Sequence, residues 1–307
     1  MRYKRWLTQR IHELESNANI IETKQGIVEY QIRGNAPFLL FFHPGNGGYD
    51  QSFLNNHLLE AGFGCISFSR PGYLRTPLST GKTFAEQADV AAALLEQLNI
   101  PTVAVHGASM GGAAAIQFAA RHPERTTALL LTSAISTIYP YVFPFWARFM
   151  TGSDFGSWLS LLLLKKFPQV VLKEALKLSS TYSKAEVQQE IEKTIDQSEK
   201  LDFFYKMTHS TTPAKLRKAG IFNDLKQCDH IKKVPLPLHK ITCPTLIVHG
   251  DSDGDVTFSH AEYSKQQIAN SELLTLKDAY HLVWLSDWAP KMNQAQIEFL
   301  QKYHIEQ

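Results

Sequence analysis

Cysteine is scarce in this sequence of 307 residues, and the three cysteines, Cys65, Cys228 and Cys243, lie far apart. They form no C-x-x-C pair, so we expect neither a zinc site nor a disulfide framework and interpret them as reduced thiols in a reducing compartment. The 12 histidines are scattered and include no H-E-x-x-H pair. The sequence therefore gives no reason to expect a metal or another cofactor.

Excess charge and long apolar runs are also missing. The formal net charge is only +2, which gives no electrostatic reason to expect a nucleic-acid partner. The most apolar later stretch, 158–164, is too short to span a bilayer. The basic residues near the N-terminus are not followed by the apolar region of a targeting signal, so we interpret them as part of a polar leading helix. We expect a cytoplasmic protein without stable membrane insertion, and the sequence indicates no particular oligomeric state.

What the chain does have is a regular alternation of expected strands and expected helices. A hairpin pattern (20–22 with 27–32) precedes apolar runs typical of buried strands, and these alternate with segments of helical periodicity. The expected later strands are 37–42, 65–68, 103–106, 128–131, 241–248 and 272–276, and the expected helices include 51–61, 84–98, 260–268 and 288–301. Such alternation is typical of an α/β fold with a doubly wound, mostly parallel sheet.

The alternation is interrupted once, after Ile135. The following block shows no strand signal, only aromatic-rich and helical segments, and proline-rich punctuation ends it. We expect residues 1–135 and 236–307 to form one core domain. Residues 136–235 are expected to form a helical lid or cap inserted before the late strands.

The most informative motif is Gly107-Ala108-Ser109-Met110-Gly111, which follows an apolar, β-branched run and precedes a run of small residues. This is the G-x-S-x-G pattern, in which a serine occupies the sharp corner between a strand and a helix. The corner forces the serine into a strained backbone conformation, and bulk at 107 or 111 would collide with the strand or helix. The alternative is an ordinary strand-turn-helix with a serine that caps the helix.

A serine hydroxyl needs a base to become a nucleophile, and the base needs an acid to hold its tautomer. Two later loops, each directly after an expected strand, supply candidates. The first carries Asp251, Asp253 and Asp255, and the second carries His281. The order Ser, Asp, His along the chain fits an arrangement with the serine at a strand-to-helix corner.

A calcium loop is the competing interpretation of the acidic segment. Asp251, Asp253, Asp255 and Glu262 occupy positions 1, 3, 5 and 12 of an EF-hand loop. However, Val256 stands where that loop requires glycine, and an apolar strand precedes the segment in place of a helix. We therefore do not expect calcium here.

With these motifs in order, the chain resembles the α/β-hydrolase fold family from near its N-terminus to its end. The resemblance rests on the loop His43-Pro44-Gly45-Asn46-Gly47-Gly48, the serine motif, Gly250-x-x-Asp253-x-x-Val256, and His281 after the last strand. Pro44 and Tyr280 are departures, because the family usually carries glycine at both positions.

The resemblance implies a role for each motif residue. Ser109 would be the nucleophile, His281 the base and Asp253 the orienting acid, with Asp251 and Asp255 as the alternatives to Asp253. The backbone N–H groups of Met110 and of Gly45 or Asn46 would form the oxyanion hole. The remaining candidate histidines, His43, His106 and His249, are interpreted as structural.

These roles predict a serine hydrolase that forms an acyl-enzyme on a small-molecule substrate. The aromatic block between Tyr139 and Phe167 is expected mainly to pack the lid onto the body, with the remainder lining an apolar pocket. Because that block contains no cluster of Lys or Arg, we expect a small to medium, mostly apolar ester or related acyl compound. An unperturbed histidine base titrates near ~6.5, so activity is expected to rise through roughly pH 6–7.

Other functions stay open at this point. Within the fold they are a thioesterase, an amidase or aminopeptidase, and a hydrolase of carbon–carbon bonds, because fold does not decide among chemistries. Outside enzymology they are a non-catalytic ligand-binding protein that keeps the pocket, and a lipid-surface protein that uses the lid aromatics.

Overall fold

The structure is a computed structural model that describes residues 2–140 and 152–304. Within these residues an 8-stranded sheet has the order β1-β2-β4-β3-β5-β6-β7-β8. Its strands are β1 Asn19–Thr23, β2 Gly26–Arg33, β3 Phe38–Phe42, β4 Gly64–Phe68, β5 Val103–Ala108, β6 Thr126–Thr132, β7 Thr245–Gly250 and β8 Ser271–Leu276. The β1–β2 hairpin pairs antiparallel to β4, and all other neighbouring strands are parallel. The predicted mostly parallel sheet is confirmed.

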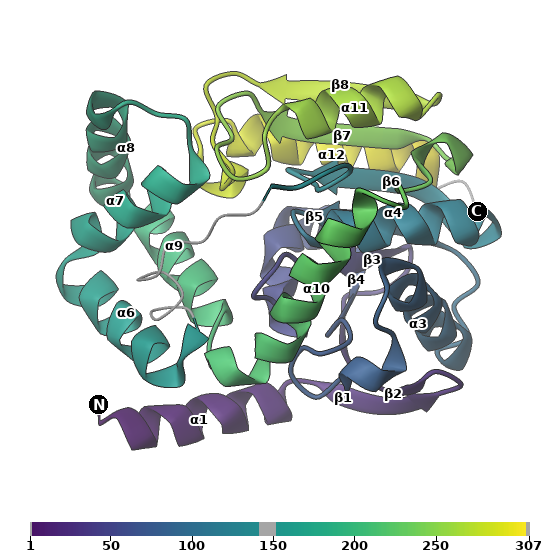
Figure 1. Cartoon of the computed structure of the whole chain (residues 1–307), viewed down its shortest axis with the longest axis horizontal. Helices are drawn as coiled ribbons and strands as arrows, with labels where there is room; N and C mark the ends of the chain where they lie inside the picture. Colours follow the sequence, from purple (N-terminus) through teal and green to yellow (C-terminus); the bar gives the residue numbers. More distant parts are fainter. Residues whose placement is uncertain (1, 141–151, 305–307) are drawn as a thin grey trace.

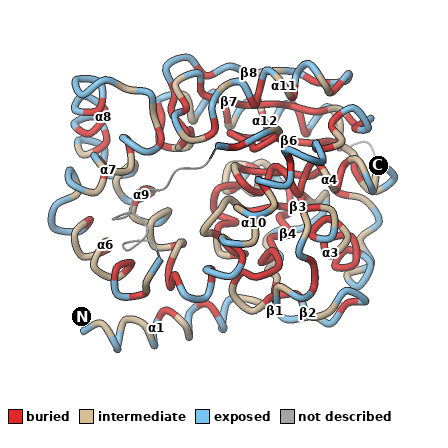
Figure 2. The backbone as a smooth tube through the Cα atoms, in the orientation of Figure 1, coloured by how far each residue is buried: buried red, intermediate tan, exposed pale blue. Residues whose placement is uncertain are grey.

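Helices cover both faces of the sheet (Figure 1). On one face lie α3 (Phe84–Gln97), α4 (Gly111–Arg121) and α11 (Ser259–Gln267), and on the other lie α2 (Asn56–Glu60) and α12 (Ala289–His304). Side chains of a strand alternate between the two cores: Leu40 and Phe42 pack with α3 and α4, whereas Leu39 packs with α12. The five central strands, β3 to β7, are accordingly almost continuously buried (Figure 2), whereas β1, β2 and β8 at the edges of the sheet are partly exposed.

In the described residues between β6 and β7 there are five α-helices: α6 Asp154–Lys166, α7 Pro168–Ser179, α8 Lys184–Asp196, α9 Ser198–Ser210 and α10 Lys218–Ile231. The first four share an apolar cluster that includes Leu164, Leu172 and Val187. By contrast, α10 runs diagonally across the middle of the molecule (Figure 1) and contributes Cys228 and Ile231 to the main core. The expected doubly wound fold with a helical insertion before the late strands is therefore present.

The structure corrects two expected elements. Residues 51–61 do not form one α-helix, because a 3₁₀ segment, Tyr49–Asn55, precedes the short α2. Every residue of this 3₁₀ segment except Asp50 is buried. The strand expected over 241–248 begins only at Thr245, because Pro244 has no backbone N–H to donate to a neighbouring strand. Further 3₁₀ segments are Leu78–Thr80, Pro123–Arg125, Ala214–Leu216, Leu238–Lys240 and Val283–Leu285.

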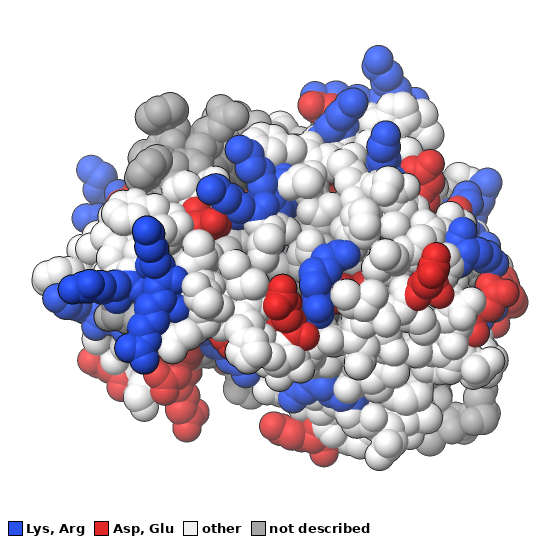
Figure 3. Space-filling view, turned by 90° about the horizontal axis from the view of Figure 1, so that it is seen from below, with Lys and Arg blue, Asp and Glu red and all other residues white. Residues whose placement is uncertain are grey.

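Helix α1 (Tyr3–Ser16) lies along one edge of the molecule and contacts α6 (Figure 1). The face seen from that side carries both basic and acidic side chains among uncharged ones (Figure 3), in keeping with the net charge of +2. Within the described ranges, no helix has both the length and the apolar character needed to cross a membrane.

Candidate active site

Ser109 occupies the corner between β5 and α4 in a left-handed backbone conformation, with φ of +49°. Its N–H donates to the carbonyl of Thr132 at 3.0 Å, and its own carbonyl accepts from Gly112 and Ile135, each at 3.0 Å. A non-glycine residue in a sparsely populated backbone region costs about 1–3 kcal/mol and persists only where its surroundings fix it. These three hydrogen bonds fix Ser109 there.

The glycines on either side of Ser109 are required by close packing. A Cβ atom at Gly107 would lie 2.5 Å from Cβ of Ala115, and one at Gly111 would lie 2.2 Å from the carbonyl oxygen of Phe42. A side chain at either position would therefore collide with its surroundings, as the motif predicts: at 107 with α4 and at 111 with β3.

The side chains of Ser109, His281 and Asp253 form a continuous hydrogen-bonded chain. Oγ of Ser109 lies 3.0 Å from Nε2 of His281, and Nδ1 of His281 lies 2.8 Å from Oδ2 of Asp253. Asp253 follows β7 and His281 follows β8, so parallel strands deliver both side chains to the edge of the sheet where Ser109 lies. The ring of His281 thus contacts Asp253 and Ser109, which lie 28 and 172 positions before it in the sequence.

Asp253 is held from several directions. Its Oδ1 accepts hydrogen bonds from the backbone N–H groups of Asp255 and Val256, at 2.9 and 2.8 Å. Nε2 of His249 donates to the Val256 carbonyl at 2.7 Å and also lies 3.2 Å from Oδ2 of Asp253. Burial alone would raise the pKa of Asp253, but the charge of His281 and the hydrogen bonds from both histidines lower it to about 2. Asp253 is therefore ionised across the neutral range.

His281 is also strongly perturbed. Burial acts to lower its pKa, whereas the carboxylates of Asp253 and Asp255 and the hydrogen bond to Asp253 raise it, to about 9 overall. The expectation of an unperturbed histidine is wrong, because two carboxylates flank the ring.

The other two aspartates of the loop have different surroundings. Asp251 turns away from the histidine and accepts the backbone N–H of Asp278 at 2.6 Å. Asp255 places Oδ2 at 3.5 Å from Nε2 of His281, and its Oδ1 accepts from the hydroxyl of Tyr139. Across the described residues, no group of three or more His, Cys, Asp or Glu side chains is arranged to hold a metal ion.

The loop 43–48, which is expected to contribute to the oxyanion hole and is called the oxyanion loop below, lies beside Ser109. Gly45, Asn46 and Met110 line the same cavity as Ser109, and Gly45 packs against the Met110 side chain. Among the described residues, no acceptor pairs with the backbone N–H of Met110 or of Asn46. Both groups are therefore free to donate to a ligand.

Two histidines expected to be structural are so. His43 is buried at the start of the oxyanion loop, where Nδ1 lies 2.7 Å from the Pro44 carbonyl and Nε2 accepts the Arg70 N–H at 3.1 Å. Burial, with Arg70 nearby, lowers the pKa of His43 well below its usual value. His106 pairs with Asn55 and Thr132 inside the core.

A cavity of about 500 Å³ opens over Ser109. It is bounded by the oxyanion loop, the sheet edge and the inserted helices, and none of its described lining residues is Lys or Arg. Its apolar lining is mostly aliphatic and includes Leu163, Val170, Val171, Leu178, Met207, Ile221 and Leu225, with Phe53, Phe204 and Trp284.

The aromatic block between Tyr139 and Phe167 lies only partly in the described residues. Within it, Phe155 and Trp158 pack against Tyr3 of α1, which is the packing role expected for most of the block. Tyr139 does line the cavity. The remaining candidates, Tyr141, Phe143, Phe145, Trp146, Phe149 and Met150, lie outside the described residues.

No sequence pattern predicts one further contact of the site. The carbonyl of Ser179, at the end of α7, accepts the backbone N–H of His281 at 2.8 Å and that of Gly254 at 3.2 Å. The inserted helices therefore touch both loops that carry the candidate base and acid. A backbone carbonyl leaves no signal in the residue types.

Comparisons with known proteins agree with this architecture. The family described as alpha/beta hydrolase fold matches residues 37–287. An uncharacterized hydrolase, YcgS, from Bacillus subtilis (strain 168) is 29% identical over 284 residues, which are 90% of this chain and 95% of that protein.

Solved structures give the same result. An alpha/beta hydrolase fold protein from Nakamurella multipartita is 30% identical with a TM-score of 0.86, covering 92% of this chain and 99% of that one. An esterase from Exiguobacterium antarcticum shares the fold, with 20% identity, a TM-score of 0.63 and coverage of 92% and 99%. The family match over most of the chain carries the conclusion: this protein belongs to the alpha/beta hydrolase fold family.

Proposed function

We propose that this protein is a serine hydrolase in which Ser109 is the nucleophile, His281 the general base and Asp253 the acid that orients it. The observation that carries the proposal is the hydrogen-bonded chain from Ser109 Oγ through His281 to Asp253, with links of 3.0 and 2.8 Å. The strained backbone of Ser109, which presents its hydroxyl to the cavity, supports the same assignment.

In the proposed reaction, neutral His281 accepts the hydroxyl proton of Ser109 at Nε2 while Oγ attacks the substrate carbonyl carbon. The resulting imidazolium donates that proton to the leaving group, which departs as an alcohol and leaves an acyl-enzyme. Water then attacks the acyl carbon, with its proton passing to Nε2, and Ser109 is released with the carboxylic acid. Asp253, ionised and accepting a hydrogen bond from the Nδ1–H group of His281, keeps Nε2 available as the proton acceptor.

The backbone N–H groups of Met110 and of Gly45 or Asn46 would stabilise the oxyanion of the tetrahedral intermediate. Their place beside Ser109 and the lack of an acceptor for the Met110 and Asn46 groups, within the described residues, support this role. Fixed donors of this kind typically contribute ~3–4 kcal/mol each to transition-state stabilisation.

The substrate would be a small to medium, mostly apolar ester or related acyl compound. The support is a cavity of about 500 Å³ that is lined mainly by aliphatic side chains and, in its described part, by no Lys or Arg. Residues 136–235 would act as a lid or cap on the core formed by 1–135 and 236–307. The contacts of Ser179 with His281 and Gly254 are consistent with this arrangement.

A second candidate is hydrolysis of an aminoacyl amide, and Asp255 favours it. Its carboxylate lines the cavity 3.5 Å from Nε2 of His281. A substrate ammonium group next to the scissile bond would find a negative partner there.

The test is labelling by a fluorophosphonate probe, followed by turnover of aryl esters and of aminoacyl amides. Wild type should be labelled and should prefer esters, whereas Ser109→Ala should not be labelled. Ser157→Ala is the matched control, because Ser157 is a buried serine whose hydroxyl donates to the backbone carbonyl of Ser153, the residue that caps its own helix. A wild-type protein that is neither labelled nor active on either class would contradict the proposal.

A further inference from the structure

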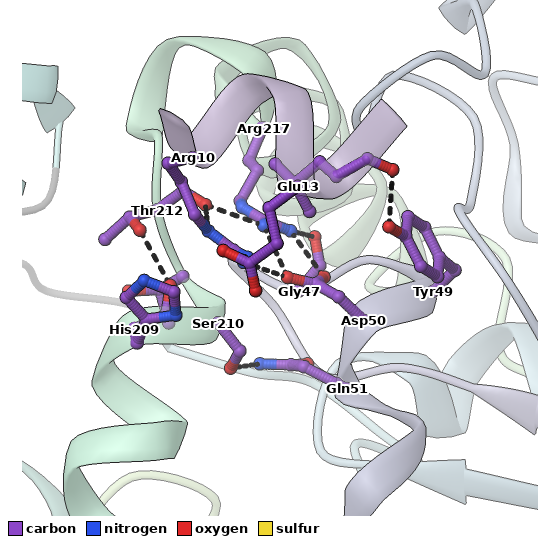
Figure 4. A network of polar contacts seen from close by, with 12 residues as sticks. Arg10, Glu13, Gly47, Tyr49, Asp50, Gln51, His209, Ser210, Thr212 and Arg217 are labelled. Atoms are coloured by element: carbon purple, nitrogen blue, oxygen red, sulfur yellow. Dashed lines mark hydrogen bonds and ion pairs between the residues drawn. The ribbon is translucent and has the colours of Figure 1, made fainter. Parts of the chain in front are cut away.

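A buried arginine from the inserted helices holds the oxyanion loop. Arg217, directly before α10, is fully buried, and its Nη1 donates to the carbonyl of Gly47 at 2.6 Å (Figure 4). The same guanidinium forms a two-point ion pair with Asp50, at 3.2 and 3.0 Å. Its Nη2 also donates to the carbonyl of Thr212 at 2.9 Å. Arg217 thus joins the inserted segment to the loop beside Ser109.

The N-terminal helix completes this network. Arg10 of α1 approaches Asp50 at 2.5 Å and donates to the Thr212 carbonyl at 3.3 Å (Figure 4). Arg10 is itself almost fully buried, and Glu13 lies 3.1 Å from it. Two arginines are therefore balanced by two carboxylates, as a buried charge requires.

The other end of the oxyanion loop is held through α10 as well. Asp224, two helical turns beyond Arg217, forms an ion pair of 2.7 Å with Arg70, and both side chains are fully buried. Nε of Arg70 donates to the carbonyl of His43 at 3.2 Å. The carbonyls of His43 and Gly47, one at each end of the loop, are therefore both held by charged groups that depend on α10.

Between these two points lies a tight turn. The Gly47 N–H donates to the Pro44 carbonyl at 3.3 Å, so Gly45 and Asn46 are the central residues of the turn. Asn46 has a φ of +60°, which few non-glycine residues adopt. Fixing both ends of such a turn fixes the directions of its central N–H groups.

We propose that Arg217 is a positioning residue for the oxyanion loop: it holds the Gly47 carbonyl so that the N–H groups of Gly45 and Asn46 face the reacting oxygen. The inference rests on the proposed function. It adds that an ion pair between the inserted helices and the core sets the geometry of the oxyanion hole.

The test compares Arg217→Met with Arg217→Lys and with Gly48→Ala. A lysine keeps the charge but cannot serve Gly47 and both oxygens of Asp50 together. A Cβ atom at Gly48 would lie 2.7 Å from Nη1 of Arg217 and 2.5 Å from Cδ1 of Leu74, so this variant crowds the guanidinium without removing its charge. Arg75→Met is the matched control. Arg75 forms an ion pair of 2.6 Å with the buried Glu29, and neither residue is among the described residues that line the cavity.

Four quantities are measured for each variant: kcat and KM on an aryl ester, the melting temperature, and deuterium exchange of peptides spanning residues 43–55. For Arg217→Met we expect kcat to fall about 10- to 100-fold, because a small misplacement can cost about 100-fold. KM should stay within about twofold, and exchange in the loop should accelerate. Arg217→Lys and Gly48→Ala should show smaller losses of the same kind.

Two outcomes would overturn the proposal. One is wild-type kcat in a folded Arg217→Met protein. The other is an equal loss of kcat in Arg217→Met and Arg75→Met, which would indicate a general effect of stability. If wild type itself hydrolyses nothing, the proposed function fails, and exchange decides the positioning role separately: unchanged exchange in the loop would then refute it.

Discussion

The Oδ2 oxygen of Asp255 lies 3.5 Å from Nε2 of His281, the same ring nitrogen that lies 3.0 Å from Oγ of Ser109. Asp253 contacts the opposite ring nitrogen at 2.8 Å. The imidazole is therefore placed between two carboxylates, and both favour its protonated form.

The first prediction concerns pH. A base must be neutral to accept a proton, and the pKa of His281 is raised to about 9, so kcat/KM should keep rising with pH above 7 until His281 is deprotonated. Asp255→Asn removes one of the charges that raise this pKa, so the rise of kcat/KM with pH should occur at lower pH in this variant than in wild type. The measurement is kcat/KM for an aryl acetate from pH 5 to 10. Asp251→Asn changes a carboxylate that does not contact the ring, so its kcat/KM should rise over the same pH range as in wild type. Identical profiles for wild type and Asp255→Asn would contradict this.

The second prediction concerns Ser109 and His281 as a unit. Each alanine variant should lose on the order of 10⁴–10⁶ in kcat, and the double variant should be little worse than either single one. Both steps of the proposed reaction need the pair, so the second substitution has little left to remove. Steady-state and single-turnover rates for the three variants decide this, and additive losses would show that the two residues act independently.

The third prediction concerns the acid. Asp253→Asn keeps the shape of the side chain but can stabilise the wrong tautomer of His281, so kcat should fall about 10⁴-fold. Asp251→Asn, which removes a charge but keeps an amide oxygen that can accept the Asp278 N–H, should cost far less. Kinetics on proteins with matched circular dichroism spectra provide the check. A greater loss for Asp251→Asn than for Asp253→Asn would show that Asp253 is not the acid.

The fourth prediction concerns chain length. Each methylene buried is worth about 0.8 kcal/mol, so kcat/KM should rise about fourfold per carbon across aryl esters until the cavity of about 500 Å³ is filled. Leu163→Trp narrows that cavity and should move the optimum to shorter chains. A flat series, or faster turnover of aminoacyl amides, would favour a different substrate class.

The elements nearest the reaction could be predicted from the sequence because each follows from a local pattern. Ser109 lies in a five-residue motif, and Asp253 and His281 each follow an apolar strand. The ion pair of Arg217 with Asp50 spans 167 positions, and no spacing rule connects residues so far apart. The raised pKa of His281 also escaped prediction, because it depends on how closely the carboxylates of Asp253 and Asp255 approach the ring once the loop has folded.

The cavity lining was harder to predict for a different reason. Aromatic residues marked the start of the inserted segment, but Phe155 and Trp158 contact α1, whereas aliphatic residues of α6 and α7 face the cavity. Composition reports how apolar a segment is, and only packing decides which side of a helix meets the substrate.

The two kinds of helix in the inserted segment matter for protein engineering. Helices α6–α9 share a separate apolar cluster that also includes Tyr280 and Leu285, whereas α10 packs in the main core and follows directly after Arg217. A chimera that exchanges α6–α9 and rejoins the chain at Ser210 would keep both anchors of the oxyanion loop, whereas an exchange through α10 would remove them. Selectivity could then diversify in one stretch of the insertion while the next stretch is constrained by catalysis.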